Sequence, residues 1–286
     1  MKPSLYLVAT PIGNLSDFSD RARQILSEVD FVAAEDTRKT GILLKHFGIK
    51  KPLISYFEHN IAERGEVIIA RLLQGQTCAL VSDAGMPAIS DPGEVLVRQC
   101  MERGLVVSVV PGPCAAVTAL AMSGLSTKRF CFEGFLSTAR NSRMKHLQSL
   151  KHESRTMIFY EAPHKLCGTI ADLYEVFGDR RVSFVREITK IYEQTLLTTL
   201  SQAIAFYQEN PPRGEFVVIV EGESEEQLPA YSPDTIRQMF EECLAQGMKK
   251  TAAAKQVAEQ CGLSKREVYD MFKGEGEVTD ENHCQF

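Results

Sequence analysis

Residues 77–93 read TCALVSDAGMPAISDPG, and this stretch decides the fold. Its first part, Thr77–Ser82, is a short apolar run of the kind that predicts a buried strand. A polar loop with two aspartates, two prolines and two glycines follows, and Glu94–Arg103 then has the periodicity of a helix. A strand that passes through a loop into a helix is the repeating unit of an α/β sheet, so this stretch predicts that class of fold.

The loop itself, Ser82–Gly93, has the composition of a ligand site. Open α/β sheets bind ligands outside the carboxyl ends of their strands, which is where this loop lies. Gly85 lets the backbone approach a ligand closely, and free N–H groups in such a loop can hold a carboxylate. Asp83 is suited to an ammonium group or a ribose hydroxyl. The alternative is an elaborate connection without a ligand, but the density of proline, glycine and aspartate favours a site.

The same alternation of short apolar runs and amphipathic stretches continues on both sides of this loop. The other predicted strands of the first half are Leu5–Thr10, Phe31–Ala34 and Val106–Val110. The predicted helices are Ser19–Val29 with Ser19 as N-cap, Thr37–Phe47, Asn60–Leu73, Glu94–Arg103 and Cys114–Met122. Strands that alternate with helices indicate a mostly parallel sheet with helices on its faces.

The pattern changes near residue 125, which predicts a second α/β domain. Its expected strands are Phe130–Phe132, Thr156–Tyr160, Val182–Val185, Gln194–Thr198 and Phe216–Val220. Helices are expected at Ser142–Leu150 and Pro163–Phe177. The strands after residue 180 follow one another closely, so we expect a mixed sheet here.

The chain therefore divides into residues 1–124, residues 125–222, a polar linker over 223–232, a helical unit over 233–273 and a disordered tail over 274–286. Within the helical unit, Ala258, Gly262 and Val268 have helix-turn-helix spacing, and Ser264 is placed to cap the second helix. The unit has seven basic and six acidic residues, which is a modest surplus of positive charge. The alternative is a helical packing module that has this spacing by chance.

Composition excludes several classes of protein. No apolar run approaches the ~20 residues that span a membrane, and Leu5–Ala9 is too short for a signal peptide. The net charge is −5, whereas proteins that coat nucleic acid are basic, so any RNA binding must use local patches. The eight cysteines form no C-x-x-C pair, so we expect buried, reduced thiols of a cytosolic protein and no metal site.

Three further loops follow strands in the first half. Residues 10–17 read TPIGNLSD, residues 35–39 read EDTRK, and residues 111–116 read PGPCAA. None of them matches the glycine-rich fingerprint of dinucleotide-binding proteins, and the chain has no P-loop. Residues 35–39 are either a capped helix start or part of the wall of a substrate cleft, whereas Pro113 suits a first helical turn and the small residues after it leave room for a ligand.

Six motifs in this order carry a resemblance. They are P-x-G-N-x-x-D, E-D-T-R, S-D-A-G-x-P-x-x-S-D-P-G, V-P-G-P-x-A, F-x-G-F-L and F-Y-E-A-P-H. Together they resemble the tetrapyrrole (corrin/porphyrin) methylase superfamily over residues 4–222. Within it, the chain is most similar to the enzymes that methylate a cytidine ribose 2′-hydroxyl of 16S ribosomal RNA in the small subunit.

The resemblance implies two α/β domains of the class III methyltransferase type, with S-adenosylmethionine (SAM) in the cleft between them. It also implies a homodimer, a cytoplasmic enzyme, and the small ribosomal subunit as partner. The implied cofactor-binding residues are Asp83, Ala84, Gly85, Met86, Ala115, Ala116, Phe159, Tyr160, Glu161, Ala162, Pro212, Arg213, Gly214 and Glu215. The implied residues on the acceptor side are Asn14, Asp17, Asp36, Arg38 and Lys39.

One segment departs from the family pattern. After Gly134-Phe135-Leu136 the family has proline and a basic run, whereas this chain has Ser137-Thr138-Ala139-Arg140. Positive charge is still supplied there, and again in the helical unit. The basic residues that we expect to contact RNA are Arg140, Arg143, Lys145, Lys249, Lys250, Lys265 and Arg266.

Methyl transfer needs an oxygen nucleophile in line with the S–CH3 bond, so the protein mainly has to orient the reactants. A group that removes the hydroxyl proton adds about 10²–10⁴-fold. The sequence offers Asp17, Asp36, Glu161 and His164 as candidates and does not choose among them.

Two other functions remain open at this point. A methylase acting on a tetrapyrrole is the nearest alternative, although a small macrocycle gives no use for the helical unit. A metabolite-sensing regulator that binds nucleic acid through that unit is the other. If RNA is the acceptor, the acidic composition predicts recognition of an assembled subunit by shape and local contacts, rather than of naked RNA.

Overall fold

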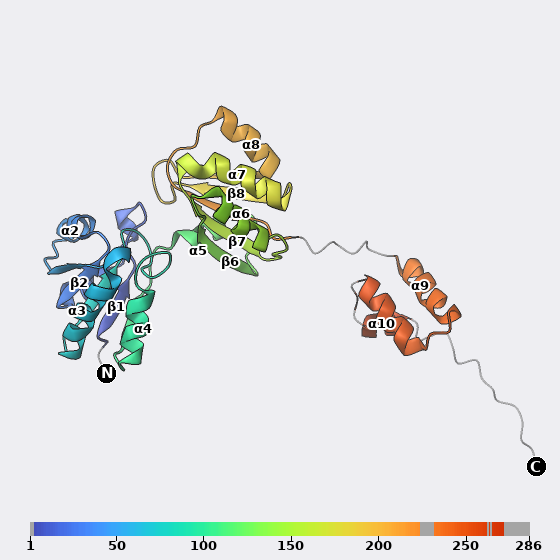
Figure 1. Cartoon of the computed structure of the whole chain (residues 1–286), viewed down its shortest axis with the longest axis horizontal. Coiled ribbons are helices and arrows are strands. Elements are labelled where there is room, and N and C mark those ends of the chain that lie inside the picture. Colours follow the sequence, from blue (N-terminus) through green and yellow to red (C-terminus); the bar gives the residue numbers. More distant parts are fainter. Residues whose placement is uncertain (1–2, 224–231, 262, 264, 272–286) are drawn as a thin grey trace, which may run out of the picture. The chain divides into compact units, whose positions relative to one another are not determined.

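The computed structural model describes residues 3–223, 232–261, 263 and 265–271. The chain forms two compact units, Met1–Glu223 and Ser224–Phe286 (Figure 1). The first unit contains two five-stranded sheets, and the second is helical. Among the helices of the described residues, none is long and apolar enough to cross a membrane.

The first sheet is entirely parallel, as predicted. Its strand order is β3-β2-β4-β1-β5, from β1 (Leu5–Val8), β2 (Phe31–Ala34), β3 (Leu53–Ser55), β4 (Cys78–Val81) and β5 (Val107–Val110). The strand β3 was not predicted, because three half-buried residues give no recognisable pattern.

Helices cover both faces of this sheet. The helices α1 (Asp20–Glu28) and α2 (Thr37–His46) pack on one face, and α3 (Ile61–Leu73) and α4 (Glu94–Glu102) pack on the other. Ser19 caps α1 as predicted, accepting a hydrogen bond from the backbone N–H of Ala22. Since β1 leads to one face and its neighbour β4 to the other, the chain has a topological switch point between them, where α/β sheets bind ligands.

The second sheet is mixed, as predicted. Its order is β6-β7-β10-β8-β9, from β6 (Phe130–Phe135), β7 (Thr156–Glu161), β8 (Arg181–Arg186), β9 (Gln194–Thr199) and β10 (Phe216–Val220). Only β6 and β7 are parallel neighbours. One face is covered by α6 (Arg140–Ser149), α7 (Pro163–Phe177) and α8 (Leu200–Glu209). The helix α8 was not predicted, and α6 begins two residues before its predicted start.

The helix α5 (Ala115–Met122) covers the other face of the second sheet, although it directly follows the last strand of the first. Ala116 and Leu120 pack among apolar side chains of the second sheet, including Ile158 and Val217. The backbone N–H of Ala116 also donates to the Tyr160 hydroxyl, over 3.1 Å. These contacts join the two sheets, and residues up to Glu223 form one compact unit. The predicted boundary between two domains at residues 124 and 125 stays a prediction.

The helical unit contains α9 (Pro233–Ala245), α10 (Lys250–Cys261) and α11 (Lys265–Met271) around a core of their own. Ala258 and Val268 are both buried in this core, as helix-turn-helix spacing requires. Gly262, Ser264, nearly all of the predicted linker and the whole predicted tail lie outside the described residues.

The seven cysteines in the described residues are all free. Cys78, Cys100 and Cys243 are buried, but Cys167 on α7 is exposed, contrary to the expected burial. The described part of the chain contains no group of histidine, cysteine or acidic side chains able to hold a metal ion.

Candidate functional site

A cavity of about 420 Å³ lies where the loops of the first sheet face the second sheet; we call it the large cavity. The loop after β4 forms one wall, and the ends of β7 and β10 form the opposite wall. Its lining residues are Ile12, Ala84, Gly85, Met86, Ile89, Ser90, Asp91, Cys114, Ala115, Phe135, Tyr160, Glu161, Ala162, Pro163, Val185, Ile188, Lys190, Glu215, Phe216 and Val217. Most of these are apolar, as in sites for small organic ligands.

The loop after β4 is held in a strained conformation. Gly85 has a φ of 85° and exchanges two backbone hydrogen bonds with Thr10, of 2.9 and 3.0 Å. Farther along, Ala88 and Ser90 have φ values of 68° and 61°, which side chains other than glycine rarely adopt. Such residues cost on the order of 1–3 kcal/mol each and gather at ligand sites.

Glu161 is buried at the end of β7, with 3% of its surface exposed. Its carboxylate accepts hydrogen bonds from the Thr169 hydroxyl at 2.5 Å and from the Ala162 N–H at 2.8 Å. The Lys165 ammonium group lies 3.0 Å away, one helical turn into α7. These partners fix the turn between β7 and α7 and leave the carboxylate fully engaged.

Lys190 enters the large cavity from the loop between β8 and β9. Its ammonium group lies 2.9 Å from the Glu187 carboxylate and 2.8 Å from that of Glu215. The Glu187 carboxylate also accepts the backbone N–H of Glu215, over 2.9 Å. This trio therefore ties the β8–β9 loop to the start of β10, with one negative charge left over.

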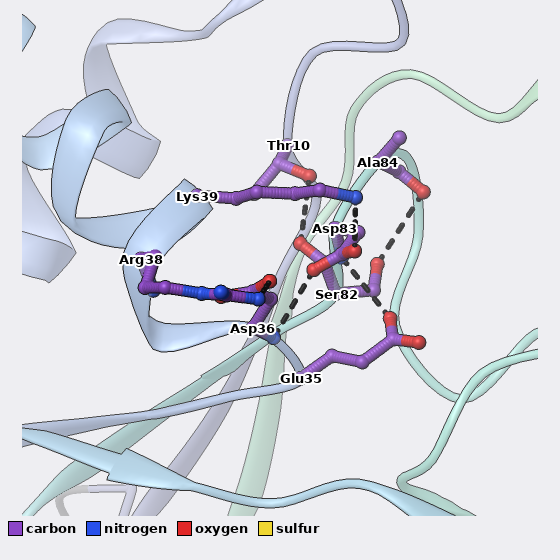
Figure 2. Close-up of polar contacts among 8 residues, drawn as sticks. All are labelled: Thr10, Glu35, Asp36, Arg38, Lys39, Ser82, Asp83 and Ala84. Carbon is purple, nitrogen blue, oxygen red and sulfur yellow. Dashed lines mark hydrogen bonds and ion pairs between the residues drawn. The ribbon is translucent and has the colours of Figure 1, made fainter.

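A second cavity of about 200 Å³, the small cavity, lies at the switch point between β1 and β4. Its lining residues are Thr10, Pro11, Gly13, Leu15, Lys39, Thr40, Leu43, Ser82 and Asp83. Figure 2 shows its polar side: Asp83 accepts from the Asp36 N–H at 3.1 Å and pairs with the Lys39 ammonium group at 2.6 Å. The Asp83 N–H donates to Glu35, so one aspartate joins the ends of β2 and β4.

Asp36 caps α2 by accepting the Arg38 N–H. The Arg38 guanidinium group also donates to both oxygens of this carboxylate, at 3.2 and 2.9 Å. The hydrogen bonds from Arg38 lower the pKa of Asp36 to about 2. Hydrogen bonding to Asp83 likewise raises the pKa of Lys39, so Lys39 is a cation at neutral pH and not a neutral base.

The structure brings eight of the predicted cofactor residues to the large cavity: Ala84, Gly85, Met86, Ala115, Tyr160, Glu161, Ala162 and Glu215. Asp83 lines the small cavity instead, and Phe159 points into the core on the other face of the sheet. Neither cavity is lined by Ala116, Pro212, Arg213 or Gly214. Asp91 and Lys190 line the large cavity without having been predicted; Asp91 stands in the quoted loop, whereas no motif marks Lys190.

Of the four candidate bases, only Glu161 is among the residues that line these two cavities. Asp17 is exposed in the short 3-10 helix η1 (Leu15–Asp17), and His164 is exposed in the first turn of α7. Asn14 accepts the Ser16 N–H and caps η1. On the acceptor side, the structure therefore brings together Asp36, Arg38 and Lys39 but places Asn14 and Asp17 at the surface.

The basic residues around α6 are tied to α7. Arg140 pairs with Asp172 and Glu175, and Arg143 pairs with Asp172 while donating to two carbonyl groups before α6. These contacts hold the segment that departs from the family pattern. Lys145 is exposed, as are Lys249, Lys250 and Arg266 in the helical unit, and Lys265 begins α11.

Matches with known proteins extend over most of the chain. A family model described as "Tetrapyrrole (Corrin/Porphyrin) Methylases" matches residues 4–204. A protein of Synechocystis sp. named "Ribosomal RNA small subunit methyltransferase I" is 48% identical, over 93% of this chain and 96% of its own length. A protein of the same name from Thermotoga maritima is 45% identical over 218 residues, which are 76% of this chain and 98% of its own length.

Among solved structures, uroporphyrin-III-C-methyltransferase from Thermus thermophilus is similar with a TM-score of 0.55 and 19% identity. The match covers 76% of this chain and 94% of that chain, and it confirms the predicted fold class. The solved structure shows only the fold, whereas the family model and the two relatives also show to which family the chain belongs. The chain belongs to the tetrapyrrole (corrin/porphyrin) methylase family, together with relatives that are named ribosomal RNA small subunit methyltransferase I.

Proposed function

We propose that this protein transfers a methyl group from SAM to a cytidine ribose 2′-hydroxyl of small-subunit ribosomal RNA. The observation that carries the proposal is the pairing of two cavities at one switch point, a large apolar one and a small one with charged side chains on one side. The names of the relatives indicate the acceptor, because they match over nearly their whole length.

The residues of the large cavity fit SAM. A volume of about 420 Å³ is within the range of small-molecule sites, and the apolar wall suits an adenine ring and a thioether chain. At Gly85, φ is 85° and an added Cβ would lie 3.3 Å from Ile12, so a side chain at this position of the wall would be strained. Asp91 and the Lys190 trio supply negative charge for a ligand that is a cation.

When bound, SAM supplies an electrophilic methyl group on a sulfonium. The protein's part is orientation, which is worth about 7–11 kcal/mol in well-placed intramolecular reactions. The short backbone bridge between Thr10 and Gly85 joins the walls of the two cavities. This bridge fixes the position of the cofactor relative to the acceptor.

The small cavity is the proposed place of the acceptor nucleotide. Lys39 keeps its charge there and is suited to a phosphate oxygen, and the Arg38 side chain is 88% exposed beside it. Asp36 is a weak base, because its pKa is about 2, and Glu161 already has three partners. We therefore infer that positioning contributes more to the rate than any of the four candidate bases.

The test is transfer of labelled methyl from SAM to small ribosomal subunits that lack this modification, followed by nucleoside analysis. We expect label in 2′-O-methylated cytidine, and faster transfer to subunits than to naked RNA. Transfer to a precorrin instead would support the tetrapyrrole alternative. Specific binding of duplex DNA without transfer would support the regulator.

The helical unit is proposed to contact the RNA substrate. The Thermotoga relative, which matches over 218 residues and 98% of its length, is too short to contain counterparts of both units. The methyl transfer machinery is therefore expected in residues 3–223, with the helical unit adding affinity for the substrate.

Reversing the charge of Lys249 and Lys250 together should raise the KM for small subunits about tenfold, because each lysine lost from a phosphate weakens RNA binding. The dissociation constant of SAM should stay unchanged. Reversing Arg64 on α3 and Arg98 on α4, which are both exposed, provides a matched control, which should leave this KM within about twofold. Equal KM values for the Lys249/Lys250 variant and the native protein would favour the alternative, in which the helical unit is a packing module that does not bind RNA through these lysines.

We also propose a homodimer that acts in the cytoplasm. Val117, Met122 and Leu197 are exposed apolar side chains, and an added Cβ on Gly124 would meet Leu197 at 3.1 Å, so the end of α5 lies beside β9. A surface of this kind is typical of an interface between protein chains. A solution mass of one chain, 31.9 kDa, would contradict the dimer.

A further inference from the structure

Asp91 is the one carboxylate of the large cavity without an ion partner in the described part of the chain. Three carboxylates line this cavity. Glu161 pairs with Lys165, and Glu215 shares Lys190 with Glu187. The neutral Ser82 side chain lowers the pKa of Asp91 but supplies no positive charge. A charge left without a partner in a half-buried cavity is costly, so it calls for a cation from elsewhere.

The groups that face Asp91 make its unpaired negative charge more costly, because among the described residues they include two further acids and no cation. Glu35 at the end of β2 and Asp83 in the loop after β4 are both acidic, and Tyr160 faces it from β7. Burial, followed by the charge of Glu35, raises the pKa of Asp91 to about 6. Burial also raises the pKa of Tyr160 to about 12, so the phenol stays neutral and does not balance the negative charge of Asp91.

The backbone holds Asp91 at a fixed place in the wall. Ser90 before it has a φ of 61°, and Gly93 after it has a φ of 155°. An added Cβ on Gly93 would lie 2.9 Å from both Ala88 and Leu80, so the loop is folded tightly on itself. Strain of this kind persists where the surroundings over-determine a functional geometry.

We propose that Asp91 holds the cationic centre of SAM and so makes the cavity prefer SAM to its demethylated product. The inference rests on the proposed function, which places SAM here. In the reaction the S–CH3 bond breaks with its electron pair staying on sulfur, the methyl group joins the hydroxyl oxygen, and the hydroxyl proton is released. The sulfonium becomes a neutral thioether, S-adenosylhomocysteine. A carboxylate at this place therefore binds the cationic SAM more tightly than the neutral thioether of S-adenosylhomocysteine.

The test is titration calorimetry with SAM and with S-adenosylhomocysteine, between pH 5 and pH 8. For the native protein, we expect SAM affinity to fall as the pH drops through about 6, since the protonated carboxyl no longer attracts a cation, while product affinity changes little. Asp91→Asn should weaken SAM about tenfold at pH 7.5, weaken the product less than about twofold and abolish the pH dependence. Native protein should release a proton on binding SAM near pH 6, and Asp91→Asn should not.

Glu94→Gln provides the matched control. Glu94 is exposed in the first turn of α4, three residues from Asp91, and pairs with Arg98 outside the cavity. Its loss should leave both affinities within about twofold. The ligand-free Asp91→Asn protein should melt at the same temperature as native protein or higher at pH 8, because a carboxyl with a raised pKa destabilises the fold above that pKa.

An unchanged ratio of SAM to product affinity in Asp91→Asn would overturn the inference. A lower melting temperature at pH 8 would overturn it as well, because the carboxylate would then be supporting the fold. If native protein bound no SAM at any pH, the cofactor assignment in the proposed function would be the part that fails.

Discussion

Replacing Glu161 by alanine is expected to lower the free energy of unfolding by about 3–5 kcal/mol, the cost of leaving a buried ion pair without one partner. The Lys165 side chain is 19% exposed and would keep its charge with no carboxylate beside it. The Thr169 hydroxyl and the Ala162 N–H would also lose their acceptor. Urea denaturation followed by circular dichroism gives this free energy directly.

Two variants separate this structural role from a role as base. Glu161→Gln keeps the shape and the hydrogen-bonding capacity, so it should lose about 1–2 kcal/mol and retain most of the methyl transfer rate. Glu175→Ala removes an exposed carboxylate from α7, the helix that contains Lys165, and should change stability by less than about 0.5 kcal/mol. If Glu161→Gln were as stable as native protein and inactive, Glu161 would be the base after all.

Replacing Asp83 by alanine should lower methyl transfer about 100-fold, the usual effect of a displacement near 1 Å in a reacting pair. Asp83 is the shared acceptor of Asp36 and Lys39 (Figure 2). Without it, Lys39 and the end of β2 lose their fixed position beside the small cavity. Because Asp83 does not line the large cavity, the dissociation constant of SAM should stay within about threefold.

A double-mutant cycle with Lys39→Met checks this reading. If Asp83 acts by holding Lys39, the double variant should be no slower than Asp83→Ala alone. Asp20→Asn, which removes an exposed acid that pairs with Arg23 on α1, provides the control and should leave the rate unchanged. A large loss of SAM affinity in Asp83→Ala would place this carboxylate at the cofactor, as the resemblance implies.

The sequence predicts most of the fold because each long element carries its own periodicity. The helix α8 escaped prediction for a local reason. The strand β9 ends at Thr199 and α8 begins at Leu200, so no glycine or proline separates a strand pattern from a helix pattern. Thr199 nevertheless caps the helix by accepting the Gln202 N–H, and this is a signal that the sequence does contain.

The site is predictable where a motif marks it and not where distant loops meet. The loop that contains Gly85 and Asp91 is recognisable from its composition. Lys190 and its partners Glu187 and Glu215 come together only when β8 pairs with β10, so nothing local predicts them. The place of Asp83 in the wall of the small cavity depends likewise on the fold, because its partner Lys39 is 44 residues away in the chain.

The packing of α5 on the second sheet has a mechanical consequence. The segment that leads to it, Pro111–Gly112–Pro113, is stiff, because two prolines fix φ and an added Cβ on Gly112 would lie 2.9 Å from Ala9. If the two sheets rotated away from each other, this segment would have to bend, and the buried side chains of Ala116 and Leu120 would become exposed to solvent. The width of the large cavity is thus set when the chain folds, and we expect a ligand bound there to enter a gap of fixed width, without a closing motion of the two sheets.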